Sequence, residues 1–166
     1  MTLLNPKEKM YKVNDLVPVI KGLKSQNQKI VFTNGCFDLI HVGHTRYLKA
    51  AGDAGDKLIV AVNSDNSVTQ LKGKMRPLIP LDERMEVLAS LYFVDFVVSF
   101  EELDPYNVIN QLKPNILIKG GDWPLDKIIG KDIVEQEGGK VFTIPEIPGR
   151  ATTGIIDKIL NLHKNS

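Results

Sequence analysis

The amino-acid sequence predicts an α/β fold, a doubly wound sheet of five parallel strands with helices on both faces. Short apolar runs rich in β-branched residues recur along the chain, and stretches with helical spacing of apolar residues separate them. Continuous apolar runs are typical of strands covered on both faces, as in parallel sheets. Because the two kinds of element alternate, we expect right-handed βαβ units.

Each predicted element has its own signal in the sequence. The apolar runs predict strands over 29–33, 58–62, 96–98, 116–118 and 141–144. The segments between and after them predict helices over 43–54, 81–91, 104–112, 128–137 and 155–162. The helix over 81–91 has an apolar stripe with the spacing i, i+4, i+7, i+10. Asp104-Pro105 suits a helix start, and Gly138-Gly139 suits a helix stop.

The length of 166 residues fits one domain. We expect a Rossmann-like domain over 28–162, preceded by an extension over 1–27 that is partly helical at 13–24. A polar tail follows over 163–166. In such a sheet, ligands bind beyond the carboxyl ends of the strands. The chemistry is therefore expected just after Thr33, Val62, Ile118 and Ile144.

Composition excludes several classes of protein. The 21 basic and 20 acidic residues give a net charge of +1, which argues against nucleic-acid or anionic-membrane partners. The single cysteine, Cys36, excludes an intrachain disulfide and suggests a reducing cytoplasm. No apolar run resembles a signal peptide or approaches the ~20 residues of a membrane span. We expect a cytoplasmic protein with small-molecule substrates.

Two of the three histidines, His41 and His44, lie directly after the first predicted strand, where the chain leads into a helix. Gly43 between them lets the backbone approach a ligand, and the helix N-terminus offers N–H groups and positive charge to a phosphate. Imidazoles can stabilise negative charge that grows in a transition state. Taken alone, the pair also fits ordinary turn histidines. No further cysteine or histidine cluster supports zinc.

Three other segments carry candidate ligand contacts. Lys72-Gly73-Lys74 predicts a flexible loop that clamps phosphates, or alternatively a solvated charged loop. The glycines of 119–123 would let a base lie against the backbone while Asp122 holds a ribose hydroxyl; the alternative is a tight turn plugged by Trp123. Thr152 and Thr153 suit helix caps, and Arg150 could reach a phosphate.

The segment Gly35-x-Phe37-Asp38-x-x-His41-x-Gly43-His44 resembles the signature of the cytidylyltransferase-like nucleotidyltransferase superfamily. The resemblance covers roughly 28–162. It implies that His41, His44 and Lys72 are catalytic. Implied nucleotide contacts are Thr33, Asn34, Gly35, Cys36, Phe37, Gly43, Lys119, Gly121, Asp122, Arg150, Thr152 and Thr153. Implied acceptor contacts are Asp38, Asn63, Asp65, Lys74, Arg84 and Trp123.

The chain departs from the family pattern at Ala151, and neither a covalent mechanism nor a metal-binding side chain can be identified. Ala151 stands where the family has a serine, so one hydroxyl contact to the β- and γ-phosphates is missing. Cys36 has no identifiable base partner for covalent catalysis, and we interpret it as a packing residue within the motif. No metal-binding side chains are identified. The resemblance implies Mg²⁺ bound with ATP and held largely by the phosphates.

Segments 32–38, 61–65 and 134–139 are similar to the D-glycero-β-D-manno-heptose 1-phosphate adenylyltransferases of this superfamily, in a stand-alone form without a kinase half. The implied reaction joins AMP from ATP to a sugar 1-phosphate, giving ADP-heptose and pyrophosphate. Glycerol-3-phosphate or ethanolamine-phosphate cytidylyltransferase is one alternative, and a non-catalytic nucleotide sensor is another. Family members are commonly dimers, so we expect a homo-oligomer, a dimer or tetramer.

Overall fold

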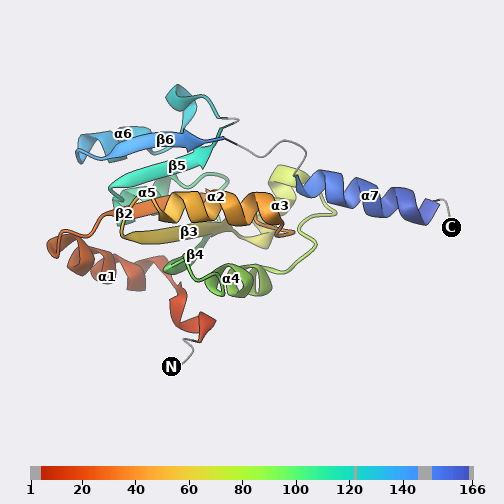
Figure 1. Cartoon of the computed structure of the whole chain (residues 1–166), viewed down its shortest axis with the longest axis horizontal. Helices are drawn as coiled ribbons and strands as arrows, with labels where there is room; N and C mark the ends of the chain where they lie inside the picture. The colour runs from red at the N-terminus through yellow and green to blue at the C-terminus, as the bar shows by residue number, and fades with distance from the viewer. Residues whose placement is uncertain (1–4, 122, 146–150, 165–166) are drawn as a thin grey trace.

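A computed structural model describes residues 5–121, 123–145 and 151–164. Within them, six strands form one parallel sheet in the order β1-β4-β3-β2-β5-β6 (Figure 1). The strands are β1 Met10–Tyr11, β2 Ile30–Gly35, β3 Lys57–Asn63, β4 Phe96–Phe100, β5 Ile116–Gly120 and β6 Lys140–Ile144. The helices are α1 Val13–Ser25, α2 Val42–Gly52, α3 Asp65–Lys72, α4 Leu81–Ala89, α5 Tyr106–Leu112, α6 Lys131–Gln136 and α7 Thr152–Lys164, and the 3₁₀ turns are η1 Pro6–Lys9 and η2 Leu125–Lys127.

Helices cover both faces of the sheet, as the sequence predicts. Helices α1, α5 and α6 bury Leu16, Ile109 and Val134 against one face. Helices α2 and α4 bury Leu48 and Leu88 against the other face. These five side chains have no exposed surface, and burying a leucine or isoleucine contributes about 1.5–3 kcal/mol. The two apolar layers therefore hold the central strands between them.

The sheet has one strand more than the five predicted. Strand β1 pairs with β4 at the edge, through Met10 opposite Val97 and Tyr11 opposite Val98. A two-residue strand carries no period-2 signal in the sequence, so the pattern could not reveal it. Because β1 and α1 both lie in the predicted N-terminal extension, and Leu16 and Ile20 of α1 are buried, this extension packs onto the sheet and its core.

Three helices differ from the prediction in ways that affect the site. Helix α3 replaces the flexible loop expected around Lys72, which is the last residue of this helix. Ser64 caps α3 by accepting a hydrogen bond from the backbone N–H of Ser67. Helix α7 begins at Thr152, three residues earlier than predicted, and runs into the predicted tail. Helix α6 begins at Lys131, because η2 precedes it.

Within the described part of the chain, no helix has both the length and the apolar character needed to cross a bilayer. Helix α7 extends away from the sheet (Figure 1). Its side chains Ile155, Ile159, Leu160 and Leu162 are between 36% and 62% exposed. The core of the domain therefore does not depend on this helix beyond its first turn.

Gly139→Ala should destabilise the protein, because a Cβ there would lie 2.5 Å from the Asn115 carbonyl oxygen and 2.7 Å from the Val134 side chain. We expect the free energy of unfolding to fall by about 1–3 kcal/mol, the usual effect of overpacking. Chemical denaturation measures this change. Gly22→Ala in α1 is the matched control, since nothing lies within 4 Å of its Cβ, and it should stabilise by roughly 0.5–1 kcal/mol. Equal effects at the two positions would contradict this packing.

Candidate active site

A cavity of about 590 Å³ opens at the carboxyl ends of β2, β5 and β6. This volume is typical of a small-molecule site. Its position is the switch point of the sheet, between β2 and β5, where ligands of open α/β sheets bind. The lining includes these sequence-predicted residues: Asn34, Gly35, Cys36, Phe37, Asp38, His41, Gly43, His44, Asn63, Lys72, Lys119, Trp123, Thr152 and Thr153.

The two histidines lie together at the start of α2. His41 is the N-cap of this helix, and its Nδ1 atom accepts a hydrogen bond of 3.1 Å from the Gly43 backbone N–H. The rings of His41 and His44 stack with centroids 3.9 Å apart. Stacked imidazoles beside free N–H groups form a site suited to an anion.

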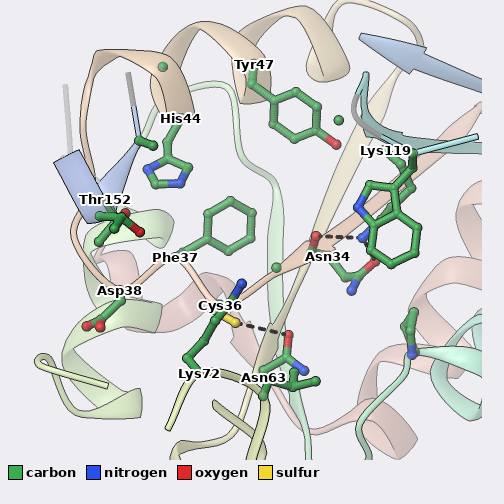
Figure 2. Close-up of a pocket in the computed structure, with 18 of the residues that line it drawn as sticks. Asn34, Cys36, Phe37, Asp38, His44, Tyr47, Asn63, Lys72, Lys119 and Thr152 are labelled. Atoms are coloured by element: carbon green, nitrogen blue, oxygen red, sulfur yellow. Dashed lines mark hydrogen bonds between the residues drawn. The ribbon is translucent and has the colours of Figure 1, made fainter. Parts of the chain in front are cut away.

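The first turn of α7 meets α2 from the other side of the cavity. The Thr152 hydroxyl donates a hydrogen bond of 3.3 Å to the Leu39 carbonyl oxygen, just before the His41 cap. Figure 2 shows Thr152 and His44 on the same side of the Phe37 ring. Two helix N-termini therefore line one end of the cavity, and their partial positive charges add there.

Burial strongly affects the ionisation of His44. Desolvation, together with repulsion from His41, lowers the pKa of His44 to about 4, although a hydrogen bond with the Leu39 backbone opposes this. Its Nδ1 atom is buried and has no hydrogen-bond partner among the described residues. The ring is therefore neutral at pH 7. A buried polar atom without a partner is rare in proteins, so this nitrogen is a candidate contact for a bound ligand.

Phe37 separates the histidine end of the cavity from the rest. Its backbone has φ of 48°, a left-handed conformation that is uncommon outside glycine. Its ring packs edge-on against His44, with centroids 5.5 Å apart. Gly35 makes room for this ring, because a Cβ there would lie 3.0 Å from the ring. The glycine and the strained phenylalanine together shape the cavity wall.

The Asp38 carboxylate, predicted to contact the acceptor, is instead bound by groups of the protein. Its side chain is only 1% exposed and binds the Arg76 guanidinium and the backbone N–H groups of Leu78 and Ile79. Burial raises the pKa of Asp38, but the two backbone N–H groups and Arg76 outweigh burial and lower it overall. The carboxylate therefore holds the 76–79 segment against the site.

Arg84, also predicted as an acceptor contact, has a side chain with no exposed surface. Its three nitrogens donate to the Ile79 carbonyl, the Cys36 carbonyl and the Asp65 carboxylate. Arg84 thus joins the chain after β2 to the starts of α3 and α4. We correct the prediction for Arg84 and Asp65: they support the site from behind and do not line the cavity.

At the end of the cavity opposite the histidines, Cys36 lies next to Asn63 and Lys72 (Figure 2). The Cys36 Sγ atom lies 4.0 Å from the Asn63 amide oxygen. Burial raises the pKa of the Cys36 thiol, and the nearby Lys72, Arg84 and Arg76 only partly offset this effect. The thiol is therefore protonated at neutral pH and poorly suited to attack a substrate.

The Lys119 side chain extends from β5 to β2 along the cavity wall. Its Nζ atom donates a hydrogen bond of 3.0 Å to the Asn34 side-chain oxygen. The same ammonium lies 5.3 Å from the centre of the Trp123 ring, a cation–π distance. Trp123 is 44% exposed. Its flat indole ring gives this side of the cavity a surface on which an aromatic base could stack.

Other predicted contacts lie elsewhere. Thr33 is fully buried beneath the cavity floor, Lys74 is exposed outside the lining, and Gly121 lies against the Pro145 backbone. Asp122 and Arg150 lie outside the described residues. Sequence reasoning missed the lining residues Arg46, Tyr47, Leu71, Arg76, Leu103, Asp104, Ile129 and Ile144. Tyr47 could have been found from its place three residues after His44, on the same helix face.

The sheet and its cavity define an α/β protein whose ligand site lies at a topological switch point. The sequence profile described as cytidylyltransferase-like matches residues 32–152, and the chain belongs to this family. The resemblance predicted from the motif of 35–44 is thereby confirmed.

Curated relatives agree with this assignment. The bifunctional protein HldE of Geobacter sulfurreducens is 46% identical over 155 residues, which cover 93% of this chain and 32% of the relative. HldE of Trichlorobacter lovleyi is 50% identical over 145 residues, 87% of this chain and 30% of the relative. The chain thus spans about a third of the length of these relatives.

Solved structures resemble the fold. A lipopolysaccharide core biosynthesis protein from Thermoplasma volcanium has a TM-score of 0.59 at 28% identity, covering 72% of this chain and 97% of that protein. A pantoate-beta-alanine ligase from Francisella tularensis has a TM-score of 0.63 at 21% identity, covering 87% of this chain and 69% of that one. The second likeness concerns the fold alone.

The buried His44 should make stability depend on pH. Its pKa is about 4 in the folded protein and 6.5 ordinarily, so the unfolded chain binds more protons between these values and stability falls as pH drops from 6.5 toward 4. We expect the melting temperature to fall from pH 7 to pH 5, and to fall less in His44→Gln. An equal loss in both proteins would contradict the burial of this ring.

Proposed function

We propose that this protein is a nucleotidyltransferase that transfers AMP from ATP to D-glycero-β-D-manno-heptose 1-phosphate, giving ADP-heptose and pyrophosphate. Membership of the cytidylyltransferase-like family supports the class of reaction. The likeness to HldE proteins and to a lipopolysaccharide core biosynthesis protein supports a surface-glycan precursor as the product. Of all the observations, the stacked His41–His44 pair between two helix N-termini carries the proposal.

The histidine end of the cavity would hold the triphosphate. Pyrophosphate carries several negative charges as it departs, and donors already fixed in place stabilise such charge without reorganising. The imidazoles, the N-terminus of α2 and the Thr153 hydroxyl lie there. The Thr152 hydroxyl, which donates to the Leu39 carbonyl oxygen in this structure, would turn to donate to a phosphate oxygen. His44 is neutral at pH 7 without a ligand. The negative charge of a bound phosphate would favour the protonated ring, which would then donate a charge-assisted hydrogen bond.

The acceptor would enter beside Cys36. Lys72 and Arg76 give this end of the cavity positive charge suited to the acceptor's phosphate, while Asn63 and Asp104 could bind sugar hydroxyls. An oxygen of the acceptor phosphate would attack the α-phosphorus of ATP in line with the leaving group. The new P–O bond forms as the bond to the α,β-bridging oxygen breaks, and pyrophosphate keeps that electron pair. The attacking phosphate is already anionic, so the reaction needs positioning more than a base.

ATP would enter as its Mg²⁺ complex. In the described part of the chain, no three His, Cys, Asp or Glu side chains gather into a metal site, and the Asp38 carboxylate is committed to Arg76 and two backbone N–H groups. Mg²⁺ keeps several waters and is often bound by substrate phosphates with few protein ligands. We therefore treat MgATP as the substrate. Assembly into a homo-oligomer stays a prediction.

A screen of acceptors tests this function. Purified protein is mixed with MgATP or MgCTP and with heptose 1-phosphate, glycerol 3-phosphate or phosphoethanolamine, and pyrophosphate release is measured. We expect ATP with heptose 1-phosphate to give the fastest turnover, and His44→Ala to lower kcat by about 10²–10³, the usual loss for one charge-stabilising donor. Preference for CTP would support the cytidylyltransferase alternative, whereas ATP binding without pyrophosphate release from any acceptor would support a nucleotide sensor.

Two neighbouring lysines provide a matched comparison. Lys72 lines the cavity, whereas Lys74 lies outside the lining. A hydrogen bond to a charged group contributes about 1.5–3 kcal/mol, so Lys72→Ala should lower kcat/KM for the sugar phosphate by roughly 10- to 100-fold. Lys74→Ala should change it by less than about threefold, as for an exposed charge. Equal losses from the two substitutions would contradict the assigned role of Lys72.

A further inference from the structure

Strands β2 and β5 are neighbours in the sheet, but their pairing is short. It joins Val31 to Ile116 and Phe32 to Leu117. Strand β2 stays paired with β3 as far as Gly35 opposite Val62, and β5 stays paired with β6 as far as Gly120 opposite Ile144. The last three residues of β2 and of β5 therefore belong to separate halves of the sheet, and the cavity lies where these halves part.

The Tyr47 hydroxyl bridges this opening. It lies 2.7 Å from the Thr33 hydroxyl of β2 and donates a hydrogen bond of 3.2 Å to the Ile118 carbonyl oxygen of β5. Because a hydroxyl has one proton to donate, the Thr33 hydroxyl donates to Tyr47. Thr33 and Ile118 are the first residues of their strands beyond the shared pairing. Both are fully buried, whereas Tyr47 is partly buried and lines the cavity.

Tyr47 also belongs to the helix that carries the histidine pair. It stands three residues after His44, and residues at this spacing lie on the same helix face. Figure 2 shows the Tyr47 ring on α2, directed toward β5, and His44 on the preceding turn. A shift of α2 relative to β2 and β5 would move the imidazoles with it. A small displacement of catalytic groups has a large effect on rate.

We infer that Tyr47 is a positioning residue, whose hydroxyl fixes α2 to both halves of the sheet and so aligns His41 and His44 with the triphosphate. This role rests on the proposed function, because the alignment concerns transfer to the acceptor. Tyr47 forms no bond with the reacting groups in this account. Its effect should therefore appear in kcat more than in the KM for ATP.

Tyr47→Phe removes the hydroxyl and keeps the ring, and Thr33→Val removes the other hydroxyl while keeping a β-branched side chain. We expect each to lower kcat about 3- to 10-fold with the KM for ATP changed less than about twofold, since one neutral hydrogen bond is lost. The double variant should be no slower than the slower single variant, because both substitutions break the same link. If Tyr47→Phe does not fold, Thr33→Val alone carries the comparison.

Tyr106→Phe is the matched control, since the Tyr106 hydroxyl donates to Asp132 at the surface and lies outside the cavity lining, and its kcat should equal that of the wild type. An unchanged kcat in Tyr47→Phe, or multiplicative losses in the double variant, would overturn the inference.

The ¹⁵N chemical shifts of the His44 ring give a readout independent of turnover. They should change in Tyr47→Phe and stay constant in Tyr106→Phe. If the wild type transfers no nucleotide, the proposed function fails, and these shifts still decide the role of Tyr47.

Discussion

Strands β2 and β5 are paired only at two positions, so the last three residues of each strand are not paired with the other. The cavity lies where the two strands part. The divergence follows from the chain order, because helix α2 leaves β2 toward one face while α6, which follows β5, covers the other. Polar groups exposed by the opening need new partners. The Tyr47 and Lys119 side chains supply them, so the same residues hold the sheet and line the site.

Two kinds of polar residue lie around the opening: buried charged side chains that hold the loops, and a histidine at the cavity. Asp38 at the cavity wall and Arg84 behind it are both buried, and their hydrogen bonds hold the neighbouring loops. A buried charge left without its hydrogen bonds costs several kcal/mol, so these bonds give the loops a fixed position. His44, at the cavity, differs from these two residues. His44 has a buried nitrogen without a partner among the described residues, and burial together with His41 lowers its pKa to about 4 because both disfavour the charged ring.

The sequence predicted the alternation of strands and helices and the position of the chemistry, because long apolar runs and the motif around His41 and His44 are local signals. It missed β1, which is too short for a pattern, and α3, whose segment has few apolar residues. Arg76 lies 38 residues from Asp38 along the chain, and the Cys36 carbonyl lies 48 residues from Arg84. Only the folded topology joins these groups, so the sequence could not reveal that Arg76 binds Asp38 or that Arg84 donates to Cys36. Arg76 was missed for the same reason, whereas Tyr47 has a local signal in its place three residues after His44.

A crystal structure with magnesium and a non-hydrolysable ATP analogue tests the central claim most directly. We expect the β- and γ-phosphates to lie between the N-termini of α2 and α7, with phosphate oxygens about 2.7–3.2 Å from an imidazole nitrogen of His41 or His44 and from the Thr152 hydroxyl, which would turn away from Leu39. Phosphates bound elsewhere on the chain, with both imidazoles turned away from the nucleotide, would contradict it.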